Sequence, residues 1–219
     1  AGWRRRSRIL MAARRIRALT LAAGLVGWNG LVDPLLPSRW QPLVRGLVGS
    51  GLLLATGARP GLRPPVVWSG LRVGAAAAGV VTAGVVASTA IPAVRRGMGE
   101  RDLPPAAGWL LLRIPVGTVW SEEAAFRAAL AGVCDAAFGP ASGQLLQATA
   151  FGLSHIADAR ATGQSVVATV VVTAVAGWVL GRLALRSGSL VAPMLAHLAI
   201  NEVAAVLALR DQRGLSRRP

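Results

Sequence analysis

Long apolar runs, separated by short polar segments, constrain this sequence more than any other feature. Several windows reach the roughly 20 mostly apolar residues that a membrane-spanning helix needs. Only 15% of the residues are charged and the mean hydropathy is +0.53, whereas about 25% of the residues in an ordinary soluble domain are charged. The runs therefore predict an all-α fold, a polytopic transmembrane helical bundle, in an integral membrane protein.

The runs divide into about seven expected membrane helices, with a count of six to eight left open. Seven helices with a cytoplasmic N-terminus would place the Arg-rich C-terminal tail outside, against the positive-inside tendency. The first run follows a basic segment but ends without a small-residue cleavage site, so we expect an uncleaved first helix. Asp135, Gly139 and Pro140 interrupt the helical pattern and predict a turn or a re-entrant element. The expected helices cover residues 18–32, 42–58, 68–94, a fourth from 106 through Glu122 and Glu123, 145–159, 165–185 and 190–209.

Small residues in the third expected helix, between Gly74 and Gly79, would allow a close approach of neighbouring helices and predict a central position in the bundle. The polar segment at residues 95–105 is the expected boundary between two parts of the chain. Residues 1–102 would form a basic segment and membrane helices, and residues 103–219 the functional membrane core with a polar tail.

The net charge of +15 comes from arginine alone, because the sequence contains no lysine. Most of the arginines stand at the ends of apolar runs, where basic residues orient helices and meet anionic lipid headgroups. We see no basic stripe with interleaved aromatic residues, so nucleic-acid binding is not expected. The lone cysteine, Cys134, excludes an intramolecular disulfide and is interpreted as a small buried apolar residue.

Two carboxylates and a guanidinium interrupt the apolar second half of the chain. Glu123 and Arg127 stand four residues apart with the acid first, the favourable order for an ion pair on one helix. Glu122 has no such partner and is free to face a cavity. Ionisable groups at bilayer depth are costly and by default indicate function. The alternative is a solvated helix end just outside the lipid.

Only two histidines occur, and both stand in apolar helices. His155 follows Phe151 by four residues, and His197 precedes Asn201 by four, which places His197 and Asn201 on one helix face. A single buried histidine is more often a satisfied core residue than a catalyst. Two histidines and a carboxylate pair on three separate helices favour a shared site.

These three patterns resemble the ordered motifs of the CPBP family, the intramembrane CAAX-processing and bacteriocin-immunity proteins also called Abi proteins, which include the Rce-type prenyl endopeptidases. Glu-Glu-x-x-x-Arg lies at residues 122–127, Phe-x-x-x-His at 151–155 and His-x-x-x-Asn at 197–201. The resemblance covers about residues 103–209. It implies an intramembrane endopeptidase of the bacterial cell membrane that acts on a membrane-associated protein or peptide and needs no cofactor.

The resemblance also implies roles for individual residues. Glu122 and His155 would hold and activate a water, and His197 and Asn201 would stabilise the oxyanion, while Glu123, Arg127 and Phe151 would support the site. These residue types suit peptide hydrolysis, which needs a general base and hydrogen-bond donors for the carbonyl oxygen. Zinc held by Glu122, His155 and His197 is the minor alternative. A non-catalytic membrane scaffold or immunity-like protein with the same fold is the alternative function.

Overall fold

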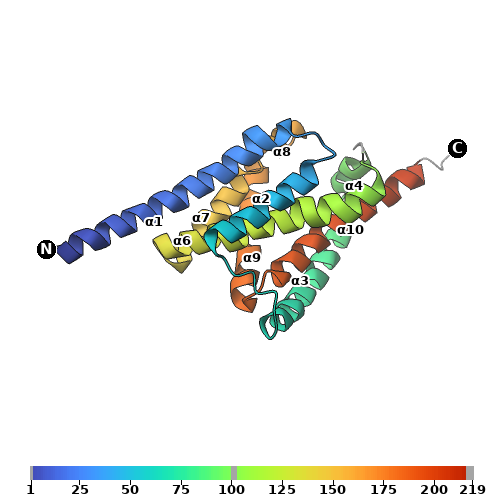
Figure 1. Cartoon of the computed structure of the whole chain (residues 1–219). Helices are drawn as coiled ribbons and strands as arrows, with labels where there is room; N and C mark the ends of the chain where they lie inside the picture. The colour runs from blue at the N-terminus through green and yellow to red at the C-terminus, as the bar shows by residue number, and fades with distance from the viewer. Residues whose placement is uncertain (1, 100–102, 216–219) are drawn as a thin grey trace.

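The structure, a computed structural model, describes residues 2–99 and 103–215. Within these ranges every regular element is helical and no strand occurs, which confirms the all-α prediction (Figure 1). The elements in chain order are α1 (Gly2–Gly27), η1 (Trp28–Val32), η2 (Asp33–Leu35), α2 (Gln41–Thr56), α3 (Val66–Ser88), α4 (Pro92–Gly99), α5 (Ala106–Gly108), η3 (Trp109–Trp120), η4 (Glu123–Leu130), α6 (Ala131–Phe138), α7 (Pro140–Leu153), α8 (Ile156–Ala161), α9 (Val166–Ser187) and α10 (Val191–Leu215).

The segment from Ala106 to Phe138 runs through the bundle as one rod (Figure 1). Its geometry changes along the way, because η3 and η4 are π-helical and only a short stretch around Ser121 and Glu122 between them is α-helical. Pro115 lies inside η3, where it cannot donate a backbone hydrogen bond. π-Helix in proteins occurs mostly as single turns inside α-helices, frequently at functional sites. The rod therefore has its least regular geometry next to the acid pair.

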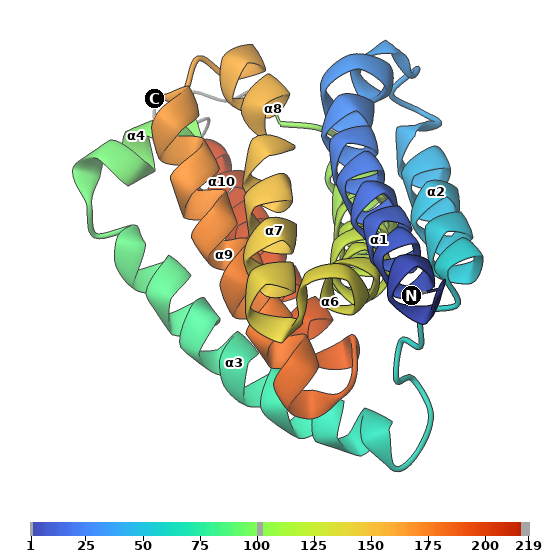
Figure 2. The same cartoon turned by 90° about the vertical axis from the view of Figure 1, so that its left-hand side faces the viewer.

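The other helices surround this rod in two groups (Figure 2). α1 and α2 lie on one side, and α3, α9 and α10 on the other, with α7 and the α6 end of the rod between them. The α1–α2 turn and α8 lie at one end of the bundle, and the α6–α7 and α9–α10 turns lie toward the opposite end. Segments far apart in the sequence therefore meet along the rod.

The core lies where α1, the rod and α7 meet. Phe126, Leu130 and Phe151 pack there with Leu25 and with Cys134, which is fully buried as predicted. The chain turns sharply between α6 and α7 at Gly139, whose φ of 80° lies in the region that favours glycine, and Pro140 begins α7. The predicted interruption is thus a tight turn between two helices.

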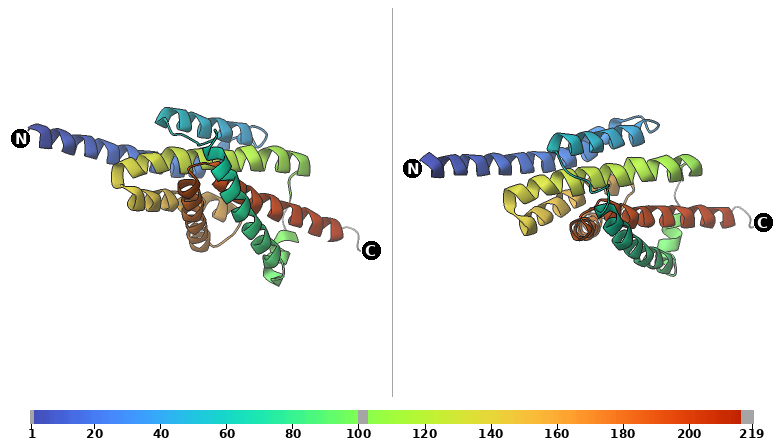
Figure 3. Two further views of the ribbon diagram at one scale, coloured as in Figure 1. Left: turned by 90° about the horizontal axis from the view of Figure 1, so that it is seen from below. Right: turned by 60° about the horizontal axis from the view of Figure 1, so that its bottom comes forward.

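The prediction that the third helix is central was wrong. α3 lies at the edge of the bundle and crosses α10 obliquely (Figure 3), and only 11% of its most apolar window is buried. Its small residues do permit close contact, because a methyl group at Gly74 would lie 2.8 Å from the Cα of Ala192. That contact involves one face of α3 and leaves the remainder of the helix exposed.

Three helices within the described ranges are long and apolar enough to cross a membrane: Val66–Ser88, Val166–Ser187 and Val191–Gln212. The expected count of about seven is not established. α2 has 16 residues and α7 has 14, both short of the roughly 20 needed, and α1 carries several arginines. Exposed apolar side chains on α9, such as Val167 and Val172, form the kind of surface that faces lipid.

Candidate functional site

Glu123 is the most enclosed member of the site. Its side chain is fully buried, and one carboxylate oxygen, Oε1, lies 2.7 Å from Nδ1 of His197 on α10. The other oxygen, Oε2, lies 3.3 Å from Nε of Arg127, so the predicted pair on one helix is present. Because an ionised carboxylate only accepts hydrogen bonds, His197 Nδ1 is the donor. The bond to His197, 74 residues away, was not predicted from the sequence.

Glu122 faces the other nitrogen of the same imidazole. Its Oε2 lies 3.9 Å from His197 Nε2, is buried, and has no hydrogen-bond partner among the residues that the structure describes. Glu122 also lines a small cavity of about 30 Å³ together with Asn29, Arg45 and Ser121. A cavity of this size is large enough to hold a water. The two adjacent acids therefore meet on one histidine.

α2 and the rod together hold Glu122 in place. Gly49 of α2 is so close to the rod that an added methyl group would lie 2.7 Å from the carbonyl oxygen of Ser121. The Ser121 hydroxyl donates to the carbonyl of Gly117, one turn earlier, and Trp120 Nε1 donates to the Ser50 hydroxyl of α2. The backbone beside Glu122 is thus fixed from two sides.

His155 occupies the junction between α7 and α8. Its Nδ1 lies 2.8 Å from the carbonyl oxygen of Phe151 and 3.3 Å from the Ser154 hydroxyl. Since a carbonyl only accepts, Nδ1 is the donor to Phe151, and in the neutral ring Nε2 is then an acceptor. Within the described residues, no hydrogen bond or ion pair joins His155 to Glu122.

Asn201 stands one turn after His197 on α10, as the spacing predicts, but its side chain bonds locally. Its amide Nδ2 donates to the carbonyl oxygen of His197 at 3.1 Å. An asparagine amide has two hydrogens, so one remains for another acceptor.

Phe151 brings the three sequence motifs together. Its ring centroid lies 4.7 Å from that of His155 and 6.5 Å from that of His197. The guanidinium carbon of Arg127 lies 3.8 Å from the same centroid, and Phe126 packs edge-on at 5.1 Å. The contact with Arg127 is short enough for a cation–π interaction. Residues that are separated by up to 71 positions in the sequence, from Phe126 to His197, thus pack around one aromatic ring.

Two charged groups near the site were not singled out from the sequence. Arg45 of α2 lines the cavity beside Glu122 and forms an ion pair with the buried Asp33 at the α1–α2 turn. Asp158 of α8 lies within the electrostatic range of Arg45 and His155; desolvation raises its pKa, and these two neighbours oppose the shift. The sequence feature that could have identified Arg45 is its position as an arginine within an apolar run that follows Asp33-Pro34.

A metal site would need several ligands at one point. Across residues 2–99 and 103–215, no three or more His, Cys, Asp or Glu side chains are grouped so that they could hold a metal ion. In this geometry Glu122, His155 and His197 do not form the three-ligand set of the zinc alternative.

Comparison with protein families gives a match in the second half of the chain. Residues 104–203 match the family model described as "Type II CAAX prenyl endopeptidase Rce1-like", and this range contains all three motifs. Neither the curated proteins nor the solved structures contain a match to the chain.

Proposed function

Because residues 104–203 belong to the Rce1-like type II CAAX prenyl endopeptidase family, we propose that this protein is an intramembrane endopeptidase. Its substrate would be a membrane-associated protein or peptide, hydrolysed by a water that Glu122 activates. One observation carries the proposal: the two carboxylates lie on either side of the His197 ring. Glu122 lies 3.9 Å from Nε2, and Glu123 lies 2.7 Å from Nδ1. A solvated helix end would not require a fully buried glutamate bound to a distant histidine.

In the proposed reaction Glu122 is the general base. Its unpartnered Oε2 accepts a proton from the water while the water oxygen bonds to the carbonyl carbon of the substrate. His155 holds the same water through Nε2, since its Nδ1 is engaged with the Phe151 carbonyl. The carbonyl electron pair moves to the oxygen, the C–N bond then breaks, and the proton passes from Glu122 to the leaving nitrogen.

His197 and Asn201 would stabilise the oxyanion of the tetrahedral intermediate. Glu123 accepts the Nδ1 hydrogen of His197. When Nε2 also carries a proton, the Glu123 carboxylate offsets the positive charge of the ring. The Nε2–H group can then donate a hydrogen bond to the oxyanion. The second hydrogen of the Asn201 amide supplies another donor. Donors fixed before reaction are commonly worth two to three orders of magnitude in rate each.

Glu123, Arg127 and Phe151 would be positioning residues. Glu123 fixes the orientation of the His197 ring through its 2.7 Å contact, and Arg127 compensates the buried carboxylate from the other side. Phe151 packs against both histidines. Such packing keeps reactive groups within the narrow range of geometry that catalysis needs.

The experiment compares membranes from cells that carry the wild type, Glu122→Gln or Glu202→Gln. Glu202 is a partly buried acid on α10, and its substitution is the matched control. Quantitative proteomics of new peptide ends should find fragments that occur with the wild type and Glu202→Gln and disappear with Glu122→Gln. Identical fragments in all three membranes would contradict the proposal, because they would show that no substrate of this protein is detectable there.

A non-catalytic membrane scaffold or immunity-like protein is the second candidate. The local bond of Asn201 to the His197 carbonyl favours it, since that amide then has a structural use. This candidate predicts that the phenotype of a deletion strain is restored as well by Glu122→Gln as by the wild type.

The proposed location is the bacterial cell membrane, with anionic lipid as a partner. Arg8, Arg14, Arg15 and Arg17 are exposed on α1, and clustered basic residues at a membrane surface bind acidic headgroups. Neutralising all four should weaken the association with anionic vesicles and leave that with zwitterionic vesicles unchanged.

A further inference from the structure

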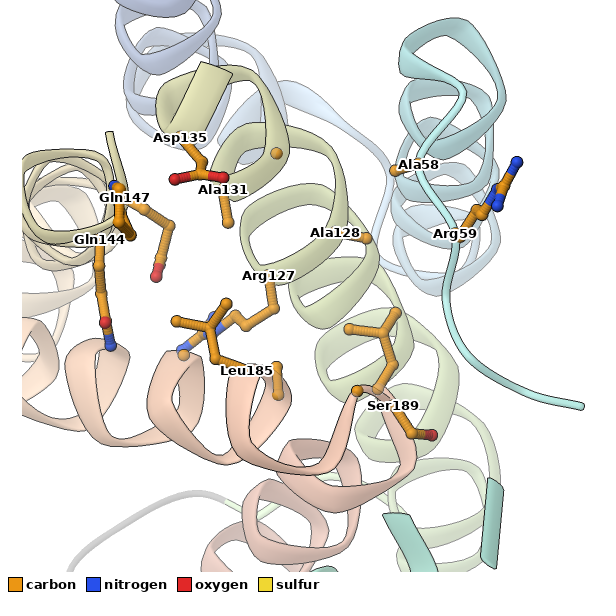
Figure 4. A pocket seen from close by; sticks show the side chains of 16 residues that line it. Ala58, Arg59, Arg127, Ala128, Ala131, Asp135, Gln144, Gln147, Leu185 and Ser189 are labelled. Atoms are coloured by element: carbon orange, nitrogen blue, oxygen red, sulfur yellow. The ribbon is translucent and has the colours of Figure 1, made fainter. Parts of the chain in front are cut away.

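A cavity of about 350 Å³ lies beside Arg127 (Figure 4). The rod, α7 and the C-terminal end of α9 form its walls, and the loop before α10 and the segment after α2 complete it. The volume falls at the lower end of the range of about 300–1,000 Å³ found for small-molecule sites. Neither Glu122, His155, His197 nor Asn201 lines this cavity.

Buried polar groups without partners face this cavity. Gln147 is fully buried, and neither its amide oxygen nor its amide nitrogen has a hydrogen-bond partner among the described residues. The same holds for Nη1 and Nη2 of Arg127, whose side chain is also buried. Both side chains point into the cavity (Figure 4). Buried polar groups in proteins are nearly always satisfied, so a concentration of orphaned ones indicates a ligand or ordered water.

The contacts of Arg127 leave one edge of its guanidinium free. The plane lies over the Phe151 ring at 3.8 Å, and Nε faces Glu123 Oε2 at 3.3 Å. The two Nη atoms remain, and a guanidinium has five N–H donors, enough to serve two carboxylates at once. A forked pair of Nη donors matches the two oxygens of a carboxylate.

The other charges that line the cavity restrict the ligand further. Asp135 adds a negative charge to the lining, whereas the guanidinium of Arg59, an exposed residue, points away from the cavity (Figure 4); a dianion would therefore meet repulsion from Asp135. A monoanion that also carries an N–H group would satisfy both Arg127 and Asp135. Gln144 already donates to the Trp178 carbonyl, which leaves Gln147 to bond the ligand.

We propose that this cavity binds a carboxylate attached to an N–H-bearing group, the chemistry shared by the C-terminal end of a peptide and a free amino acid. Arg127 binds the carboxylate through its Nη atoms, with Gln147 beside it, and Asp135 accepts from the N–H. The site goes beyond the proposed hydrolysis, because it needs none of the four residues assigned to that reaction.

The test measures binding by calorimetry to the purified full-length Glu122→Gln protein in detergent at constant ionic strength. Three probes separate the sources: acetyl-Ala-Leu with a free carboxylate, the same dipeptide as its C-terminal amide, and free leucine. We expect the acid to bind and the amide to bind at least about tenfold more weakly, the effect of losing one hydrogen bond to a charged group. Binding of leucine would extend the site to free amino acids, and binding of the dipeptide acid alone would restrict it to chain ends.

Three further substitutions place the binding in this cavity. Gln147→Leu removes the amide, and Ala131→Leu fills the space from a lining position while Arg127 itself is kept; each should weaken acid binding about tenfold or more. Leu145→Ala, on the exposed side of α7, is the control and should leave binding unchanged. Equal binding of acid and amide, or acid binding that survives both cavity substitutions, would overturn the proposal. Either result would indicate that water, rather than a carboxylate ligand, occupies the cavity. Since the host protein lacks the general base, these results do not depend on whether the wild type cleaves peptides.

Discussion

Replacing Glu123 by glutamine tests how the buried charges of this site are balanced. The substitution keeps the shape of the side chain, and its amide oxygen can still accept from His197 Nδ1. It removes the negative charge that lies 3.3 Å from Arg127 Nε. Arg127, whose side chain is fully buried, would then lack a directly contacting counter-charge.

The structure sets the size of the expected effect. Removing one partner of a buried ion pair typically costs about 3–5 kcal/mol, because the remaining charge stays buried and uncompensated. For a chain of this length, each kcal/mol lowers the melting temperature by about 2–4 °C. Glu123→Gln should therefore lower it by about 6–20 °C.

The assay is thermal unfolding of the purified protein in detergent, with three comparisons. Arg127→Met alone should also destabilise the protein, because it leaves Glu123 charged and buried. The double substitution Glu123→Gln with Arg127→Met removes both charges and should be more stable than either single variant. Glu202→Gln, at a partly buried position on α10, should change the melting temperature by no more than a few degrees.

Strict additivity would refute this reasoning. If the two single substitutions destabilise independently and the double variant is the least stable of the three, Glu123 and Arg127 are not energetically coupled. An unchanged melting temperature for Glu123→Gln would likewise show that solvent, rather than Glu123, balances the charge of Arg127.

The remaining predictions concern the approach of α2, the metal alternative and the membrane. Gly49→Ala should destabilise the fold by about 1–3 kcal/mol and reduce cleavage, since its methyl group would meet the Ser121 backbone; Gly51→Ala on the same helix meets nothing within 4 Å and should be neutral or slightly stabilising in the same unfolding assay. Peptide cleavage by the purified protein should survive exhaustive chelation. Loss of activity that stoichiometric zinc restores would instead indicate that a metal-bound hydroxide attacks the peptide bond. Alkaline carbonate should leave the protein in the membrane pellet, and its release would contradict an integral membrane protein.

Local features of this fold were predictable because they depend on neighbours in the sequence. The expected helix at residues 165–185 corresponds to α9, Val166–Ser187, and the Gly-Pro pair after Phe138 marks the turn into α7. The Glu123–Arg127 pair follows from a spacing of four on one helix. The effects of glycine, proline and helical periodicity extend over only a few residues. They can therefore be predicted from the local sequence alone.

Contacts between distant segments were not predictable in the same way. Glu122 and Glu123 point in different directions on an ideal helix, so we expected them to have separate surroundings. In the structure both carboxylates lie beside the His197 ring. The ring lies between them because α10 passes the rod at this point, where the helix changes between α and π geometry. The pairing of Arg45 with Asp33 and the position of α3 at the edge also depend on packing that composition does not encode.

The central claim is that Glu122 activates water for peptide hydrolysis, and a single rate comparison tests it most directly. Once a substrate is identified, the cleavage rate of purified Glu122→Gln in proteoliposomes is compared with the rates of the wild type and Glu202→Gln at equal protein amounts. The account predicts that Glu122→Gln unfolds at nearly the wild-type temperature while its turnover falls by orders of magnitude, and that Glu202→Gln retains full activity. Turnover of Glu122→Gln close to that of the wild type would contradict the account.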